Sequence, residues 1–364
     1  MKKICVKMFY LLAFAAALTA GCRSYEASPI DWGAEARSGV TNVVRISSVE
    51  DAAELALVGN RALNAMRLKA GASAKVAKEA GWWEDPELDF DLMRIVNPSD
   101  NPFLGGGSIA FTIPLSGALA LDEKAAEAYA EADAADIRAA ESDVAAEARQ
   151  AAIRLFALRR RGKMLVDWSR DERAERARRN VARLHDAGEV SATDLAGLRR
   201  RMHTLRHEIM ENAKETTAAE IGFLRLLGLR PGCRIELSLA DVKDVAKPSA
   251  NDDPLELVRH PKVAAALMRL GGTEHALHAE IRRQYPDLKL GPAYVNEEGM
   301  DRFGLVAGVS IPLWNRNREA IAISTGERKL KQAETLRTWH EMLQQATALQ
   351  AQQKLLLTHC RSEY

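Results

Sequence analysis

The pentapeptide Phe111-Thr112-Ile113-Pro114-Leu115 returns later in the chain as Val309-Ser310-Ile311-Pro312-Leu313. Upstream of each copy, a Pro-x-Leu motif opens a run of alternating apolar residues, first at Pro86-Glu87-Leu88 and then at Pro286-Asp287-Leu288. The offsets are 198 residues (312 − 114) and 200 residues (286 − 86), so the two copies keep their register over a long stretch. An internal repeat of this size predicts a duplicated architecture.

The first copy begins and ends with helical patterns. Ser48 followed by Asp51 predicts the capped start of a helix over residues 48–80. A second helical pattern, rich in Ala, Glu and Arg, runs over residues 119–187, which corresponds to roughly 100 Å of continuous helix. Such a length predicts a coiled coil rather than a helix enclosed by a compact domain.

Two strands are predicted between these helices. Residues 87–96 and 108–115 alternate apolar and polar side chains, as half-buried strands do. We expect Asn97–Pro102 to form the turn between them and Gly105–Gly107 to be its flexible exit.

After the long helix, the sequence predicts a turn and a return helix. Gly188 supplies a left-handed helix stop, and Ser191 with Asp194 supplies the cap of the next helix, which continues to Leu227. Pro231-Gly232 confirms that the helix has ended by that point.

The second copy repeats the same order of elements. Asp253-Pro254 is expected to open its first helix, and strands are predicted over 287–295 and in the run that ends at Leu313. A helix then begins near Asn317. Relative to the first copy, about twenty residues, the turn and the return helix do not follow, so we expect the second repeat to be truncated in its long helix.

The amino terminus predicts export. Met1-Lys2-Lys3 precedes the apolar stretch 8–17, which has the length of a signal peptide and is too short to cross a bilayer. Leu18-Thr19-Ala20-Gly21-Cys22 resembles a bacterial lipoprotein signal, in which Cys22 would carry the lipid. The alternative is ordinary secretion with cleavage before an unmodified cysteine. Residue Arg23 gives no signal for retention in an inner membrane.

Composition excludes several classes of function. A net charge of +1 gives no sign of nucleic-acid binding. Cys233 and Cys360 are far apart in sequence and are each more typical of a lone thiol than of a disulfide. Scarce aromatic residues and abundant alanine favour long, closely packed helices over a bulky core.

Several short motifs together resemble the TolC-like outer-membrane efflux family. They cover nearly everything after Val49, and their order and duplication are more specific than any one of them. Besides the lipoprotein start, they are Gly188-Glu189-Val190-Ser191 with Asp194-Leu195, Leu226-Leu227-Gly228, Tyr285-Pro286-Asp287-Leu288 and Ser310-Ile311-Pro312-Leu313-Trp314-Asn315.

The resemblance implies a mainly α chain with a small β part. Four strands are too few to close a barrel, whereas three copies would give twelve, which lies within the range of outer-membrane barrels. The family implies a homotrimer with a barrel in outer-membrane lipid and a periplasmic helical barrel, working passively with a periplasmic adaptor and an inner-membrane pump. We expect no catalytic site, cofactor or metal.

The resemblance also assigns roles to residues. Domains are expected at 1–21 (signal), 22–47 (tether), 48–232 (first repeat), 233–253 (linker) and 254–364 (second repeat). Cys22 would anchor the chain, and the helical tip that docks the adaptor would comprise Gly188, Val190, Ser191, Asp194 and Leu195. The apolar face of the barrel strands would comprise Leu88, Phe90, Leu92, Ile109, Phe111, Ile113, Leu288, Leu290, Leu305, Val309 and Ile311, with Tyr285, Tyr294, Phe303 and Trp314 as interfacial aromatics at the strand ends.

Other interpretations remain open. His203 and His207 share one helical face beside Glu208, a spacing that can hold zinc, but no third ligand is in view and a solvated helix surface is the simpler interpretation. A periplasmic adaptor lipoprotein also has a long helical hairpin, although only one. A third possibility is a truncated family member that forms no working channel.

Overall fold

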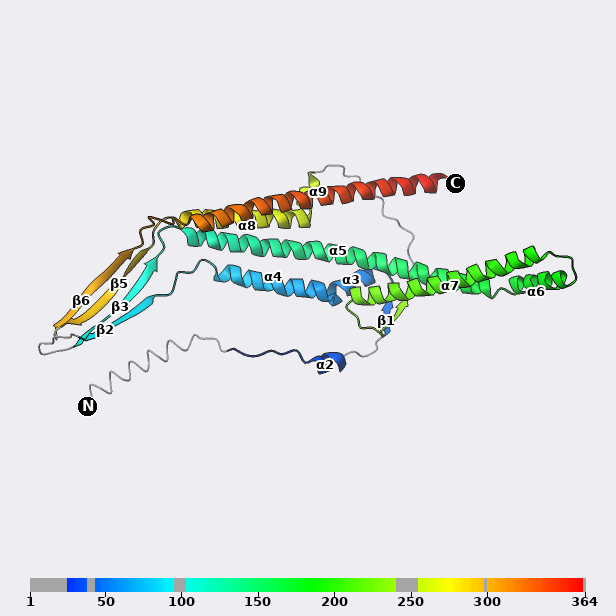
Figure 1. Ribbon diagram of the computed structural model, residues 1–364, viewed down its shortest axis with the longest axis horizontal. Helices are drawn as coiled ribbons and strands as arrows, with labels where there is room; N and C mark the ends of the chain where they lie inside the picture. The colour runs from blue at the N-terminus through cyan, green and yellow to red at the C-terminus, as the bar shows by residue number, and fades with distance from the viewer. Residues whose placement is uncertain (1–24, 38–42, 95–102, 240–254, 298–299, 363–364) are drawn as a thin grey trace. The chain divides into compact units, whose positions relative to one another are not determined.

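The computed structural model describes residues 25–37, 43–94, 103–239, 255–297 and 300–362 (Figure 1). Within these ranges the chain is mainly helical and contains two sheets. Of the described residues, those up to Val43 with 232–234 form one unit, and the others form a second unit that carries the elements of functional interest. The helices are α2 (Trp32–Arg37), α3 (Val49–Gly59), α4 (Arg61–Glu79), α5 (Ala118–Ser169), α6 (Glu172–Asp186), α7 (Ala192–Leu226), the short 3₁₀ helix η1 (Glu256–Arg259), α8 (Pro261–Arg282) and α9 (Arg318–Ser362).

The larger sheet has four antiparallel strands in the order β2-β3-β5-β6 (Figure 1). Its strands are β2 (Glu87–Arg94), β3 (Phe103–Ile113), β5 (Leu288–Glu297) and β6 (Met300–Val309). The predicted order of a helix, two strands and a long helix therefore occurs twice, as α4-β2-β3-α5 and as α8-β5-β6-α9. The two hairpins join edge to edge through β3 and β5, which makes one sheet from the two copies.

The predicted capping box at Ser48 is confirmed, but the first helix is not continuous. Asp51 N–H donates to the hydroxyl of Ser48, and the Asp51 carboxylate accepts from the backbone of Ser48. The helix is interrupted at Asn60, whose side chain accepts from Leu63 N–H and donates to the carbonyl of Leu226 on α7. A side chain that bonds the backbone in this way ends α3 and starts α4.

The long helix predicted over 119–187 is also divided. It ends at Ser169 and restarts at Glu172 as α6, because the side chain of Asp171 accepts from Arg173 N–H and caps the new helix. No Gly or Pro marks this break, so the sequence pattern predicted one continuous helix across it.

Alanine determines how closely α5 packs. Eight of its nine buried residues are alanine, and Ala132, Ala135, Ala148 and Ala152 have no exposed surface. α5 contacts α3, α4, α7 and α8, so this one helix joins elements of both copies (Figure 1). The prediction of long, closely packed helices from the alanine content is confirmed.

The second copy begins later than the sequence predicted. Asp253 and Pro254 lie outside the described residues, and the main helix α8 starts at Pro261, where His260 supplies the cap by accepting from Lys262 N–H. Residues Glu256–Arg259 form only the short 3₁₀ helix η1, and the proline at the first position of α8 is Pro261, which the sequence analysis did not single out.

The segments predicted as tether and linker contain paired strands. β1 (Val43–Ile46) lies in the predicted tether and pairs with β4 (Arg234–Leu237) in the predicted linker. Ile46 and Ile235 are buried. Strands of four residues are too short to show a period in the sequence, and only their pairing reveals them.

Candidate functional site

The four-stranded sheet has one apolar face. The pairing register places Leu88 opposite Ile109, and it places Phe111 and Ala307 on either side of Leu290. Since side chains directly opposite one another in a sheet point to the same face, the register defines a single surface. Its apolar side chains are Leu88, Phe90, Leu92, Ile109, Phe111, Ile113, Leu288, Leu290, Pro292, Tyr294, Phe303, Leu305, Ala307 and Val309, and its polar side chains, Arg94, Asn296 and Asp301, lie at the hairpin end of the sheet.

This apolar face is open. Phe90, Leu92, Phe303 and Leu305 are 76–83% exposed, so no other described part of the chain covers them. A shallow hollow of about 730 Å³ lies over the face where Gly105 and Gly107 carry no side chain. Monomeric soluble proteins rarely leave an apolar surface of this kind exposed to water.

The opposite face is polar. Its charged and hydroxyl side chains are Glu87, Asp89, Asp91, Ser108, Thr112, Lys289, Glu297 and Arg302. Lys289 Nζ lies 2.7 Å from a carboxylate oxygen of Glu87, and Arg302 lies 2.9 Å from Glu297. The two faces of the sheet therefore differ in polarity.

The sheet is also open at its sides. Among the described strands, β2 pairs only with β3, and β6 pairs only with β5. The outer backbone groups of both edge strands therefore require partners outside the described part of this chain if the sheet enters an apolar medium.

Ten of the eleven predicted strand residues lie on this apolar face. Ile311 does not, because β6 ends at Val309 and the following Ser310 begins the connection to α9. Gly105–Gly107 was wrongly predicted as a flexible turn. These three residues belong to β3 and pair with both β2 and β5. Three consecutive glycines favour a turn when only the sequence is considered. Hydrogen bonding to β2 on one side and to β5 on the other keeps Gly105–Gly107 in a strand.

The predicted interfacial aromatics take different positions. Tyr294 and Phe303 pair across β5 and β6 near the hairpin end, with ring centroids 5.1 Å apart, and the Tyr294 hydroxyl bonds to Asp301 at 2.6 Å. Tyr285 and Trp314 lie outside the strands, before β5 and after β6. Their role at a membrane interface stays a prediction.

The turn between α6 and α7 has the geometry that the sequence predicted. Gly188 has a φ of 76°, and Glu189 N–H donates to the carbonyl of Leu184 at 2.8 Å, which closes the end of α6. Ser191 caps α7, since its hydroxyl accepts from Asp194 N–H and donates to the Asp194 carboxylate. Val190 and Leu195 are half-buried.

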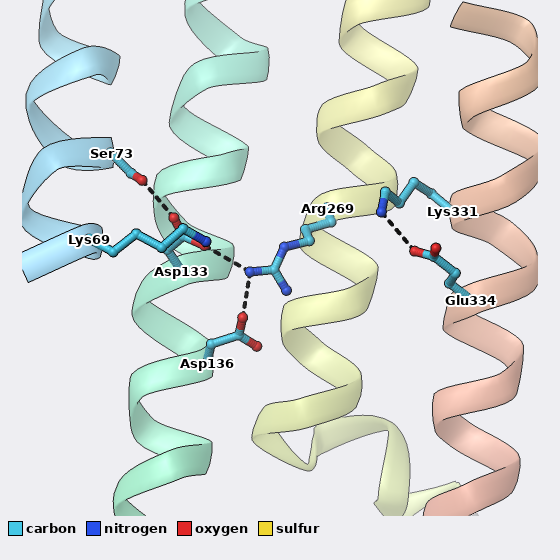
Figure 2. Close-up of polar contacts among 7 residues, drawn as sticks. All are labelled: Lys69, Ser73, Asp133, Asp136, Arg269, Lys331 and Glu334. Carbon is cyan, nitrogen blue, oxygen red and sulfur yellow. Dashed lines mark hydrogen bonds and ion pairs between the residues drawn. The ribbon is translucent and has the colours of Figure 1, made fainter. Parts of the chain in front are cut away.

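A charged cluster that the sequence did not reveal joins the two copies (Figure 2). Arg269 on α8 bonds to Asp133 at 2.8 Å and to Asp136, both on α5, while Ser73 on α4 donates to Asp133 at 2.6 Å. Burial raises the pKa of Asp133, but the hydrogen bonds from Ser73 and Arg269 outweigh it and hold that pKa below its ordinary value. The aspartates are three residues apart on one helical face, and this spacing is the only signal that the sequence offered.

The possible zinc pair shows no third ligand. His203 and His207 are exposed on α7, and no group of three His, Cys, Asp or Glu residues within the described ranges could hold a metal ion. In the same part of the chain, no helix combines the length and apolar character needed to cross a bilayer. Cys22 lies outside the described residues.

Comparison with known proteins identifies the fold. No family profile and no curated protein sequence matches the chain. Solved structures do match. The outer-membrane channel OprN has a TM-score of 0.70 at 18% identity, over 93% of this chain and 84% of OprN. CusC, described for its transmembrane channel formation, has a TM-score of 0.70 at 16% identity, over 85% of this chain and 77% of CusC. The Campylobacter jejuni outer-membrane channel CmeC has a TM-score of 0.63 at 16% identity, over 91% of this chain and 74% of CmeC.

The chain has the TolC-like fold. In this TolC-like chain, the β2-β3 and β5-β6 hairpins supply the sheet and α5, α6 and α7 supply the helical hairpin. At these low identities the likeness establishes the arrangement of helices and strands.

Proposed function

We propose that the chain is the outer-membrane channel component of a tripartite efflux or secretion system. It would form a passive duct for substrates delivered by an inner-membrane pump through a periplasmic adaptor. The observation that carries this proposal is the four-stranded sheet with one open apolar face, one charged face and two edges that no described strand pairs with.

The number of strands calls for an oligomer. Four strands cannot close on themselves, and in lipid only a closed barrel satisfies the edge groups of β2 and β6. Three copies would close a barrel of twelve strands, with the apolar face toward lipid and the charged face toward a water-filled lumen. Strands of 8–11 residues match the length that spans the hydrocarbon layer at a tilt.

The location is supported by two independent features. The solved structures with this fold are described as outer-membrane channels. The amino terminus carries the lipoprotein-like sequence that ends at Cys22, so we propose a lipid anchor at that residue in addition to the barrel. The turn from Gly188 to Leu195, at the far end of the hairpin from the helix ends near Leu227, is proposed to face the adaptor.

Native mass spectrometry of the chain extracted from outer membranes in mild detergent tests this function. We expect three chains, each carrying the mass of lipid on Cys22, and a conductance when the trimer is reconstituted in a planar bilayer. A Cys22→Ala variant is the matched control, since it should lose the lipid mass and still form the trimer. A monomer without conductance would show that the chain is a truncated relative that forms no channel.

A further inference from the structure

The apolar face of the sheet contains a groove. Gly105 and Gly107 of β3 lie on that face without side chains, while Leu92 and Phe90 stand opposite them on β2 and Tyr294 stands opposite Gly107 on β5. The resulting groove has a volume of about 730 Å³, within the range of roughly 300–1,000 Å³ that is usual for sites that bind small molecules. We call it the β3 furrow and define it by Phe90, Leu92, Gly105, Gly107, Tyr294 and Phe303.

The β3 furrow fits an apolar occupant. Its floor is the backbone of β3, which pairs with β2 on one side and with β5 on the other, so the peptide groups of the floor are already engaged. Its walls are aromatic and aliphatic, and Phe90, Leu92 and Phe303 are all largely exposed. Among the side chains that define the furrow, only Tyr294 carries a polar group, and this hydroxyl donates to Asp301 at 2.6 Å. The furrow therefore offers an occupant dispersion contacts rather than hydrogen bonds.

A cation lies at one end of the furrow. Arg94 follows Leu92 on the same face of β2, at the hairpin end of the sheet. Arg94 is exposed and forms no ion pair with any residue that the structure describes. The other polar side chains of this face at the same end are Asn296 and Asp301, and the Asp301 carboxylate accepts from Asn296 at 2.7 Å. The guanidinium of Arg94 is thus available to an anionic group from outside.

We infer that the β3 furrow binds one acyl chain of a phosphorylated glycolipid of the outer leaflet, with a phosphate of that lipid on Arg94. In hydrocarbon there is no water to fill the furrow, and its walls would lose their dispersion contacts if nothing occupied it. An acyl chain is the apolar group that a bilayer supplies. A guanidinium binds phosphate through paired hydrogen bonds, and an arginine side chain can reach the headgroup level from an apolar surface.

The connections of the chain place the furrow in the outer leaflet. Helices α4, α5, α8 and α9 all join the sheet at the strand ends remote from Arg94. In the proposed channel these helices are periplasmic, so the Arg94 end faces the outside, and the site rests on the proposed function for this orientation. Gly107 lies four residues along β3 from the position that pairs with Arg94, or about 13 Å, which is less than half of the roughly 30 Å hydrocarbon core. In an outer membrane, the lipids of that leaflet are glycolipids that carry phosphate.

The strand order argues against a second copy of this chain as the occupant. Copies would join through the edge strands β2 and β6, whereas the floor of the furrow is β3, an inner strand of the sheet. The furrow therefore stays open to lipid after the proposed trimer has closed.

Native mass spectrometry of the full chain in mild detergent tests the site, with lipid A and zwitterionic phosphatidylethanolamine as separate probes. We expect binding to saturate at one non-covalent lipid A per chain, with about tenfold higher affinity than for phosphatidylethanolamine, because a hydrogen bond between charged groups is worth about 1.5–3 kcal/mol. The lipid on Cys22 is covalent in the proposed protein and would remain after the non-covalent lipid has been stripped by collisions. Equal affinity for the two lipids, or binding that does not saturate at one per chain, would overturn the inference.

Filling the furrow provides the matched comparison. Gly105→Leu should weaken binding of lipid A by about tenfold or more, because the new side chain takes the place of the acyl chain. The heavy atom nearest to a Cβ at residue 105 is 3.9 Å away, on Leu92, so this variant should fold and assemble. Gly304→Leu on β6 is the control, since nothing lies within 4 Å of a Cβ there and the side chain would point to the opposite face. Loss of lipid A in both variants, or in neither, would refute the furrow as the binding site.

A second pair of variants tests the headgroup contact. Arg94→Gln should still bind one lipid per chain but should lose the preference for lipid A over phosphatidylethanolamine. Arg160→Gln on α5 is the control, because Arg160 is also exposed and forms no ion pair with a described residue. If Arg94→Gln retains the preference, Arg94 does not hold the phosphate.

The oligomeric state, read from the same spectra, separates this site from the proposed channel. A trimer without a preference for lipid A would refute the site and leave the channel standing. A monomer that binds one lipid A, and loses it in Gly105→Leu, would keep the site and refute the channel. Particles larger than a trimer that Gly105→Leu disperses would identify a second copy as the occupant and refute the lipid.

Discussion

A charge placed on the apolar face of the sheet should block assembly in the membrane. Leu305 is the sixth of ten residues in β6, on the open apolar face, and it is 76% exposed. Ten residues at about 3.3 Å span about 33 Å, or about 23 Å of membrane depth at a tilt of about 45°, so Leu305 lies close to the midplane of a spanning barrel. An arginine at that depth costs about 2–4 kcal/mol per chain, and therefore about 6–12 kcal/mol for a trimer.

The adjacent residue provides the control. Val306 lies in the same strand and points to the opposite, charged face, where its cross-strand partner is Gly291. Leu305→Arg should abolish the trimer that resists mild detergent in outer-membrane fractions, as judged by its altered gel mobility before and after heating. Val306→Arg should assemble. If the two variants behave alike, or if only Val306→Arg fails, the assignment of the two faces to lipid and lumen is wrong.

Three further perturbations test the local geometry. Gly291→Ala should prevent pairing of β3 with β5, because a methyl group there would overlap a carbonyl oxygen of β3. Gly304→Ala on β6 is the control, since nothing lies within 4 Å of a methyl group at that position, and this variant should fold and assemble normally. Limited proteolysis of the two purified variants distinguishes these outcomes. Gly188→Ala should destabilise the hairpin end by about 1 kcal/mol, since residue 188 has a φ of 76°, and faster amide exchange confined to the turn would show it. Arg269→Met should lower stability near neutral pH by about 1–3 kcal/mol, since it removes the guanidinium that bonds to both carboxylates and leaves Asp133 with only Ser73 and Lys69. The depressed pKa of Asp133 contributes stability that is present above the ordinary pKa of an aspartate and is lost as the pH falls below it. The melting temperature of the wild type should therefore fall more steeply on acidification than that of Arg269→Met, and parallel pH profiles would contradict this account.

The proposed channel depends on elements from both copies. Arg269 of the second copy reaches Asp133 of the first, and Arg283 of the second copy donates to the carboxylate of Asp122 of the first at 2.6 Å. The helices are thus tied together across the repeat, and the pairing of β3 with β5 joins the two hairpins. A strand pair alone is only marginally stable in water, so these contacts support the sheet before it enters a membrane.

The sequence alone determined the elements with a strong local signal. The alternating residues of β2, β5 and β6 predicted strands, the Ser48 and Ser191 motifs predicted helix starts, and Gly188 predicted a helix end. Each signal depends on a few neighbouring residues whose backbone preferences act without help from the rest of the chain. The repeat of the pentapeptide added the duplicated order of elements, which no single motif could give.

Tertiary contacts decided the points that local preference left open or favoured wrongly. Gly105–Gly107 lies in a strand because β2 and β5 bond it on both sides, and β1 exists only through its pairing with β4. The breaks at Asn60 and Asp171 arise from side-chain hydrogen bonds to backbone groups that a helical pattern does not reveal. The union of the two hairpins into one sheet with a single apolar face also required the structure, because register is a relation between residues about 180 positions apart. The sequence could specify each hairpin, but only the packing of the two copies creates the surface on which the proposed function depends.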